Sequence, residues 1–242
     1  MTRRGPALPP TPSLDTTAWY GKVPARGDFV SQGLSPTQVR VWDGWLQRGL
    51  KLASHRWSKT ALDFRLRALP AWRFLAWPEG LNSAPWAGVM VASYDRVGRA
   101  FPLTVLQGLP PLGLSDLGWL DIEAALARMA DVALDATDVI DNADITDPQE
   151  SEGFEKILLG LGAVFAPERV AARADMRVAA RPGAMPAHPQ QSAPDLARNS
   201  PGTQSLWWSE PAPGTAPLPL GDTWPPHAEL LVDMLALPDD AG

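Results

Sequence analysis

Between residues 35 and 55, apolar side chains recur at the 3.6-residue period of an α-helix. Ser35 can cap such a helix, Pro36 suits its first position, and Gln38 stands where a capping box requires Gln or Glu. The apolar stripe is formed by Val39, Trp42, Leu46, Leu50 and Ala53. The pattern predicts one long amphipathic helix that ends near His55.

Four weaker periodic segments predict further helices. They are expected at residues 60–67, from 115 or 116 to 135, 153–161 and 227–237. The apolar residues of the last segment fall on one side, and they are Leu230, Leu231, Met234 and Leu237. This side is expected to pack against the body of the protein.

Apolar runs too short for a helix predict strands at residues 19–23, 28–30, 72–77, 86–93, 101–107 and 204–208. The three runs between residues 72 and 107 follow one another closely. Because parallel neighbours need a crossover of roughly a dozen residues, these runs are predicted to form an antiparallel meander. Trp207 and Trp208 must point to opposite faces of their strand. Both are expected in the core, with an exposed binding position for one of them as the alternative.

The remaining segments lack such periods. Residues 1–17 are rich in Pro, Thr and Ser and predict a disordered tail, and residues 177–204 predict a long flexible loop. Residues 138–152 form an acidic stretch, and residues 218–226 are expected to be a loop. Since no internal repeat is present, the simplest organisation is a single domain over residues 18–242 with a mobile insertion.

Composition limits the classes of function. A net charge of −6 with 21 Lys and Arg residues argues against nucleic-acid binding, since phosphate neutralisation needs a basic face. The chain has no cysteine, which excludes disulfides and zinc–thiolate sites and fits a reducing compartment. No apolar run reaches the roughly 18 residues of a membrane span, and the first residues do not resemble a signal peptide. We therefore expect a cytoplasmic protein without direct membrane insertion.

The first candidate for recognition is the charged segment at residues 21–29. Its Lys22, Arg26 and Asp28 surround a turn that contains one Pro and one Gly. Two interpretations have equal weight: a surface turn whose amides donate to Asp28, or a recognition loop held on a rigid scaffold. A phosphate-binding P-loop is rejected, because neither Ser nor Thr follows Lys22.

The second candidate is the hairpin turn that begins at Asp95. Asp95 is predicted to form an Asx turn, and Gly98 to adopt a positive φ between two strands. Arg96 and Arg99 would then project from the tip of the hairpin, where they could bind a carboxylate or a phosphate. Alternatively, the two arginines pair with Asp28 inside the fold.

The inventory of catalytic residues is poor. The three histidines His55, His188 and His227 fall in no spacing typical of a nucleophile or of metal ligands. Neither a Gly-x-Ser-x-Gly nor a His-Glu-x-x-His motif occurs. We therefore expect no catalytic residue, no bound metal and no cofactor.

Two sets of polar residues leave alternatives open. Four aspartates follow one another at intervals of three, namely Asp138, Asp141, Asp144 and Asp147. They form either a weak divalent-cation site or a solvated run of charge, and the absence of a calcium-loop pattern favours the second. An enzyme would instead use one polar site made of Lys22, Asp28, Asp95 and Arg99.

Several stretches occur together in an order typical of one family. They read WYGKVPARGDFV from residue 19, WDGWLQRGL from residue 42, PAWRF from residue 70 with WAGV from residue 86, and SYDRVGRAFPLT from residue 93. The sequence SLWW from residue 205 looks like a further motif of that family. Together they resemble the TagF family, also called ImpM, of type VI secretion-associated proteins. Ala92 and Tyr94 depart from the family, which often has Pro and Val at these positions.

The resemblance implies a three-layer α/β sandwich of the α+β type. Its central sheet would be mainly antiparallel, with about five to six strands, and helices would flank both faces. The resemblance also implies a non-catalytic bacterial protein that represses type VI secretion after translation. It would act by binding a forkhead-associated scaffold protein, Fha, in the cytoplasm, and partners would recruit it to the inner membrane.

Some relatives in this family carry a fused phosphatase domain, and we expect this chain to act as a stand-alone regulatory module. Arg96 and Arg99 are the favoured contacts with the partner. The other candidate partner-binding residues are Lys22, Arg26, Asp28 and Asp95. The alternative to a regulator is a structural accessory subunit of the secretion apparatus.

Overall fold

The structure, a computed structural model, describes residues 17–78, 85–109, 119–138, 148–162, 165, 204–209 and 220–236. Its centre is a seven-stranded sheet in the order β2-β1-β5-β4-β3-β6-β7, and every neighbouring pair is antiparallel. The strands are β1 (Ala18–Gly21), β2 (Val30–Gln32), β3 (Trp72–Ala76), β4 (Trp86–Val91), β5 (Leu103–Gly108), β6 (Ser205–Ser209) and β7 (Leu220–Asp222).

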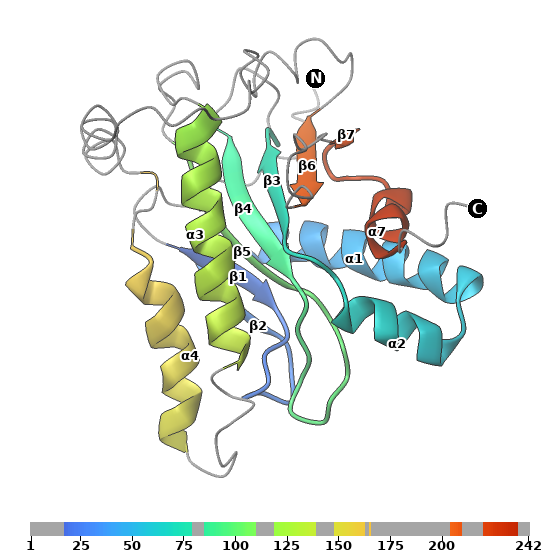
Figure 1. Cartoon of the computed structure of the whole chain (residues 1–242), viewed down its shortest axis with the longest axis horizontal. Coiled ribbons are helices and arrows are strands. Elements are labelled where there is room, and N and C mark those ends of the chain that lie inside the picture. The colour runs from blue at the N-terminus through green and yellow to red at the C-terminus, as the bar shows by residue number, and fades with distance from the viewer. Residues whose placement is uncertain are drawn as a thin grey trace, which may run out of the picture.

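Helices cover both faces of the sheet. They are α1 (Pro36–Arg56), α2 (Lys59–Arg67), α3 (Trp119–Asp138), α4 (Pro148–Gly160) and α7 (Ala228–Leu235). In Figure 1, α3 lies in front of the sheet beside α4, whereas α1 lies behind it. Buried residues accordingly form two separate cores, one beneath α3 and α4 and the other beneath α1, α2 and α7. The predicted antiparallel sheet with helices on both faces is confirmed.

The meander β3-β4-β5 lies at the centre of the sheet, as the close spacing of these runs predicted. The sheet has one strand more than expected, because β7 lies within residues 218–226, where a loop was predicted. This prediction was wrong. The strand Leu-Gly-Asp is only three residues long and pairs with β6 alone, so it carries no alternation that a sequence pattern could reveal.

The two adjacent tryptophans of β6 connect the sheet to both cores. Trp208 belongs to the core beneath α3 and α4, together with Trp19 and Phe154, whose ring centroids are 6.0 Å apart. Trp207 belongs to the opposite core, and its ring centroid lies 4.6 Å from that of Phe74. Both tryptophans are fully buried, so the expected core position of each is confirmed.

Helix α1 begins with the predicted capping box. The amide of Gln38 donates to Ser35 Oγ at 3.3 Å, and the amide of Ser35 donates to Gln38 Oε1 at 2.6 Å. The helix then ends at Arg56, one residue after the predicted end. On its buried side, a β-carbon added at Gly49 would lie 2.7 Å from the side chain of Leu231, so the glycine allows α7 to pack directly on α1.

The boundaries of α3 and α4 differ from the predicted ones. Helix α3 continues to Asp138 instead of ending at residue 135, and its predicted start at 115 or 116 lies outside the described residues. Helix α4 begins at Pro148 instead of residue 153. Part of the acidic stretch is therefore helical. Proline is compatible with this position because the first helical amide needs no partner within the helix.

Other predictions concern residues that the structure does not describe. The tail at residues 1–16 and residues 177–203 of the long loop belong to this group. So do Asp141, Asp144 and Asp147 of the aspartate run. None of the described helices is both long and apolar enough to cross a membrane.

Candidate functional site

Two loops meet at one end of the sheet. One connects β1 with β2 (residues 22–29), and the other connects β4 with β5 (residues 92–102); we call them the paired loops. They lie side by side because β1 and β5 are neighbouring strands. The amide of Arg96 donates to the carbonyl of Arg26 at 3.0 Å, and Ser93 Oγ donates to the carbonyl of Lys22 at 2.7 Å. Both loops reach the lower end of the sheet in Figure 1.

A glycine at the end of β1 makes this close approach feasible. Gly21 has a φ of 151°, and a β-carbon at this position would lie 2.3 Å from the carbonyl oxygen of Pro102. Any larger residue would push the two loops apart. The first and fourth sequence motifs therefore each contribute one side of the same junction.

The centre of the paired loops is a buried ion-pair network around Asp95. Asp95 Oδ2 accepts from Lys22 Nζ at 2.8 Å and from Arg99 Nε at 2.6 Å. Asp95 is completely buried and Lys22 is 8% exposed, whereas the side chain of Arg99 is 63% exposed. A buried carboxylate is costly unless it is paired, so this network stabilises the junction of the two loops.

The second oxygen of Asp95 shapes the hairpin turn. Asp95 Oδ1 accepts from the amides of Val97 at 3.1 Å and Arg99 at 2.9 Å. Gly98 completes the turn with a φ of 79°, and its amide donates to the carbonyl of Asp95 at 2.8 Å. The predicted Asx turn and the positive φ at Gly98 are both confirmed.

These contacts decide the charge of the Asp95 carboxyl. Burial by itself raises the pKa of Asp95, because it disfavours the charged form. The hydrogen bonds from Lys22 and Arg99 act in the opposite direction and outweigh burial, so the pKa of Asp95 lies well below its usual range. Asp95 is therefore a carboxylate at every physiological pH.

An aromatic cluster supports the first loop. The Phe29 ring stacks on Tyr20 at 5.8 Å and meets Phe101 edge-on at 4.7 Å. Lys22 Nζ lies 5.2 Å from the centre of the Phe29 ring, a cation–π geometry. Burial, followed by the hydrogen bond to Asp43 at 2.5 Å, raises the pKa of Tyr20 above its usual range. The base of the loop is thus held by contacts of Phe29 with Tyr20, Phe101 and Lys22.

Exposed arginines surround this rigid centre. Arg26 lies 3.8 Å from Glu155 of α4, and Arg99 donates to the carbonyl of Gly27 at 3.1 Å. From α2, Arg67 pairs with Asp63 at 2.8 Å, donates to the carbonyl of Gly98, and lies over the ring of Tyr94. With Arg96 and Val97 they form what we call the arginine surface, defined as Arg26, Arg67, Arg96, Val97 and Arg99.

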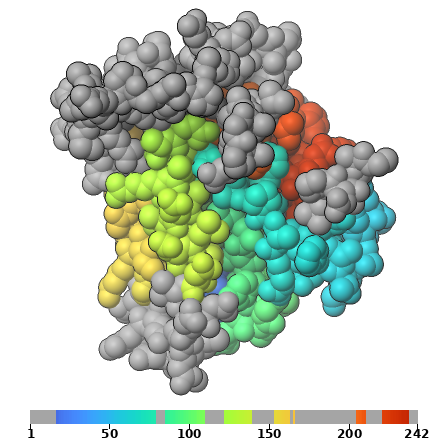
Figure 2. Space-filling model, viewed as in Figure 1, coloured from blue at the N-terminus to red at the C-terminus, as the bar shows by residue number. Residues whose placement is uncertain are grey.

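Arg96 and Val97 are the most available members of the arginine surface. The side chain of Arg96 is exposed, and within the described part of the chain it takes part in no ion pair. Val97 is 68% exposed at the tip of the turn, which is costly for an apolar residue in water. In Figure 2, the β4–β5 connection (green) reaches the surface at the lower edge, next to α2 (cyan).

The structure thus divides the six candidate residues into two groups. Lys22 and Asp95 are buried and hold the loops together, whereas the remaining four, namely Arg26, Asp28, Arg96 and Arg99, are exposed. The alternative pairing with Asp28 does not occur in the described residues, where Arg99 pairs with Asp95. Arg67 and Val97 were missed. Residue spacing alone gave no signal that the end of α2 would reach the hairpin.

The enzyme hypothesis required Lys22, Asp28, Asp95 and Arg99 to form one polar site that is open to a substrate. Lys22, Asp95 and Arg99 do converge, but they satisfy one another and leave Asp95 without exposed surface. Asp28 takes no part in this network. Among the described residues, no group of three His, Asp or Glu side chains is placed to hold a metal ion.

Fold and site define a mixed α/β protein that carries rigid, charged loops at one end of an antiparallel sheet. A family model described as the TagF N-terminal domain, type VI secretion system-associated, matches residues 18–148. This is more than half of the chain, which therefore belongs to the TagF family and is a type VI secretion-associated protein. The match includes both paired loops.

The likeness to one solved structure extends beyond the matched segment. The crystal structure of PA0076 from Pseudomonas aeruginosa PAO1 is 26% identical in sequence to this chain, with a TM-score of 0.60. The likeness covers 91% of this chain and 94% of that protein. A search of curated protein sequences gives no significant match.

Proposed function

We propose that this protein represses type VI secretion after translation by binding an Fha-type scaffold protein, and that it acts by binding instead of by catalysis. Membership of a type VI secretion-associated family supports a role in type VI secretion. The observation that carries the binding mode is that Arg96 is exposed and has no ion pair among the described residues, beside the exposed Val97. Both lie on a turn that is anchored by buried Asp95. Loops held in this way on a scaffold are typical recognition elements.

The chemistry of the arginine surface favours an acidic partner segment with an apolar residue at its centre. Guanidinium groups bind carboxylates in a bidentate manner, and arginine is enriched among the residues that dominate binding energy. Val97 gains free energy when a partner covers it, since it is exposed in the free protein. Preorganisation matters as well, because a turn that is already ordered loses little conformational entropy on binding.

The six candidate residues then have two roles. Lys22 and Asp95 position the loops, and they act on the partner only through this positioning. Arg26, Asp28, Arg96 and Arg99 are exposed and contact the partner directly. We further propose that the protein acts in the cytoplasm and reaches the inner membrane only through its partners.

The proposal is tested with the purified chain and the purified Fha-type scaffold of the same bacterium. A direct complex is expected, and Arg96→Glu is expected to weaken it at least about tenfold, because charge reversal turns attraction into repulsion. Arg48→Glu is the matched control, since Arg48 is exposed on α1, far from the turn in sequence, and the change in charge is the same.

In cells, overexpression of the wild-type chain should block secretion, and Arg96→Glu should abolish this repression. The melting temperature of Arg96→Glu should stay within a few degrees of the wild type, because exposed residues contribute little to stability. Absence of any complex between the two purified proteins would refute the partner assignment. Equal binding by Arg96→Glu and Arg48→Glu would refute the assignment of the surface.

A further inference from the structure

Helix α2 carries a phenylalanine on the side that faces away from the core. Leu62 and Leu66 of this helix pack against the core beneath α1, α2 and α7. Phe64 stands two positions from each leucine, and successive residues of an α-helix are rotated by about 100°, so its side chain leaves on the opposite side. It is 61% exposed. The two leucines therefore bury α2, and the fold does not require an apolar residue at position 64.

Phe64 and Val97 are the two most exposed large apolar residues in the described part of the chain, at 61% and 68%. They belong to different elements, and Arg67 connects them. Arg67 stands three positions after Phe64, so the two are neighbours on the surface of α2. Its guanidinium donates to the carbonyl of Gly98, the residue that follows Val97. The two apolar side chains therefore belong to one continuous surface.

Arg67 is held in place from both elements. Within α2, its Nε lies 2.8 Å from Asp63 Oδ2. In the β4–β5 loop, its guanidinium lies 5.6 Å from the ring centre of Tyr94, in addition to the hydrogen bond to Gly98. These contacts fix the end of α2 against the loop. A surface that is already ordered in this way loses little entropy when a partner binds.

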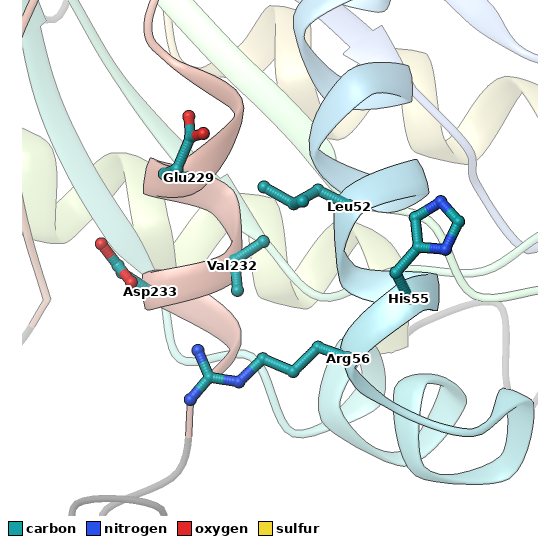
Figure 3. A pocket seen from close by; sticks show the side chains of 6 residues that line it. All are labelled: Leu52, His55, Arg56, Glu229, Val232 and Asp233. Atoms are coloured by element: carbon teal, nitrogen blue, oxygen red, sulfur yellow. The ribbon is translucent and has the colours of Figure 1, made fainter.

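A groove on the same face of the sheet offers less apolar surface. It lies between α1 and α7, has a volume of about 340 Å³ and is lined by Leu52, His55, Arg56, Glu229, Val232 and Asp233. In Figure 3, Arg56 reaches across toward α7, and His55 points away from the groove. Of the two apolar residues that line it, Val232 is 5% exposed and Leu52 is 37% exposed. Phe64 is thus the more accessible apolar side chain on these helices.

We propose that Phe64 is the apolar anchor of the complex with the Fha-type scaffold. Its ring enters an apolar pocket of the scaffold, and carboxylates around that pocket pair with the neighbouring arginines. The inference rests on the proposed function, and it extends the binding surface from the turn to α2.

The composition of this surface indicates the kind of partner. Phe64 lies beside Arg67, and the exposed Arg96 stands next to Val97, so charge complementarity requires an acidic border around the pocket. Aromatic residues and arginines are enriched at protein interfaces. An interface of ordinary size buries about 800 Å² on each protein, which is enough to cover Phe64 and Val97 together.

The first test compares affinities of the purified full chain for the purified scaffold of the same bacterium. Phe64→Ala is expected to weaken the complex at least about tenfold, because it removes the ring that fills the pocket. Phe64→Leu keeps an apolar side chain of similar reach and should stay within about threefold of the wild type. The melting temperature of Phe64→Ala should stay within a few degrees of the wild type, because an exposed side chain contributes little to stability.

Leu220→Ala is the matched control. Leu220 is 39% exposed and lies on β7, at the edge of the sheet, with β3 and β6 between β7 and β4. In Figure 1, β7 lies near the upper end of the sheet, whereas the paired loops lie at the lower end. The substitution also removes an exposed apolar side chain, and it should leave the affinity unchanged.

Salt separates the contribution of Phe64 from that of the arginines. The weakening by Phe64→Ala should be the same at about 0.1 M and about 0.5 M sodium chloride, because burial of apolar surface involves no charge that the salt can screen. The weakening by Arg96→Glu should become smaller at the higher concentration, since the Debye length decreases.

A fluorescent label tests the contact directly. The chain has no cysteine, so Phe64→Cys supplies a single thiol for an environment-sensitive fluorophore. Addition of the scaffold should shift the emission to shorter wavelength, because the pocket excludes water from the label. The same label on Leu220→Cys should show no shift.

Four results would overturn the inference. A complex that Arg96→Glu weakens and Phe64→Ala does not would refute the role of Phe64 and leave the proposed function standing. Absence of any complex with the wild-type chain would refute both. A complex in which the label at residue 64 does not shift would show that the scaffold does not cover this position. Self-association of the chain that Phe64→Ala abolishes, with unchanged binding of the scaffold, would assign the surface to a second copy.

Discussion

Asp95→Asn tests whether the paired loops are held together by charge. Asparagine keeps the shape of the side chain and an oxygen that can accept from the amides of Val97 and Arg99. It removes the carboxylate charge and leaves the ammonium of Lys22, which is 8% exposed, beside a neutral amide. Removing one partner of a buried ion pair costs about 3–5 kcal/mol. We expect the free energy of unfolding to fall by about 3 kcal/mol, near the lower end because the turn is retained.

The measurement is urea unfolding followed by tryptophan fluorescence, with two comparisons. Arg99→Gln should lose less than about 1 kcal/mol, because its side chain is 63% exposed and water screens the pair. The double variant Lys22→Met/Asp95→Asn should lose less than the sum of its single variants, since methionine removes the stranded ammonium. The reasoning fails if Asp95→Asn loses less than about 1 kcal/mol, or if the two substitutions are additive.

Three further predictions concern the paired loops and the start of α1. Gly21→Ala should lower the free energy of unfolding by at least about 2 kcal/mol, because its β-carbon would lie 2.3 Å from the carbonyl oxygen of Pro102. Gly153→Ala is the control: a β-carbon there meets nothing within 4 Å, so the free energy of unfolding should stay unchanged or rise by up to about 1 kcal/mol. Ser35→Ala should cost about 1 kcal/mol in the same urea assay through loss of the helix cap, and an unchanged midpoint would contradict it. Folding lowers the pKa of Asp95, so the stability that this carboxylate contributes is complete above its unfolded pKa of about 3.9 and is lost as the pH falls further. The difference in free energy of unfolding between wild type and Asp95→Asn should therefore be constant from pH 7 to about 5 and shrink below about 4.

Much of the fold could be predicted from local patterns. The capping box of α1 involves residues three positions apart, and the Asx turn and positive φ at Gly98 depend on a four-residue segment. The close spacing of three apolar runs was enough to predict the central meander. Where a short, polar strand pairs only at one edge, as β7 does, no such pattern exists, and the prediction of a loop was wrong.

The candidate site was predicted as a set of residues, and tertiary structure was needed to assign their roles. Lys22, Arg96 and Arg99 are all cations beside turn residues in the sequence. In the structure Lys22 is buried against Asp95, Arg99 bridges this network to the surface, and Arg96 is exposed without an ion pair in the described residues. Only the structure therefore shows that a substitution of Lys22 or Asp95 should change stability, whereas a substitution of Arg96 should change binding.

By itself, the sequence determined the elements that depend on neighbours along the chain: the amphipathic helices, the meander and the turn at Asp95. Only the tertiary structure decided which distant groups meet. Lys22 and Asp95 are 73 positions apart in the sequence, yet their side chains form a buried ion pair. The physical reason is that charge and burial depend on the packing of whole elements, and an isolated segment contains neither its partner nor the surface that excludes water.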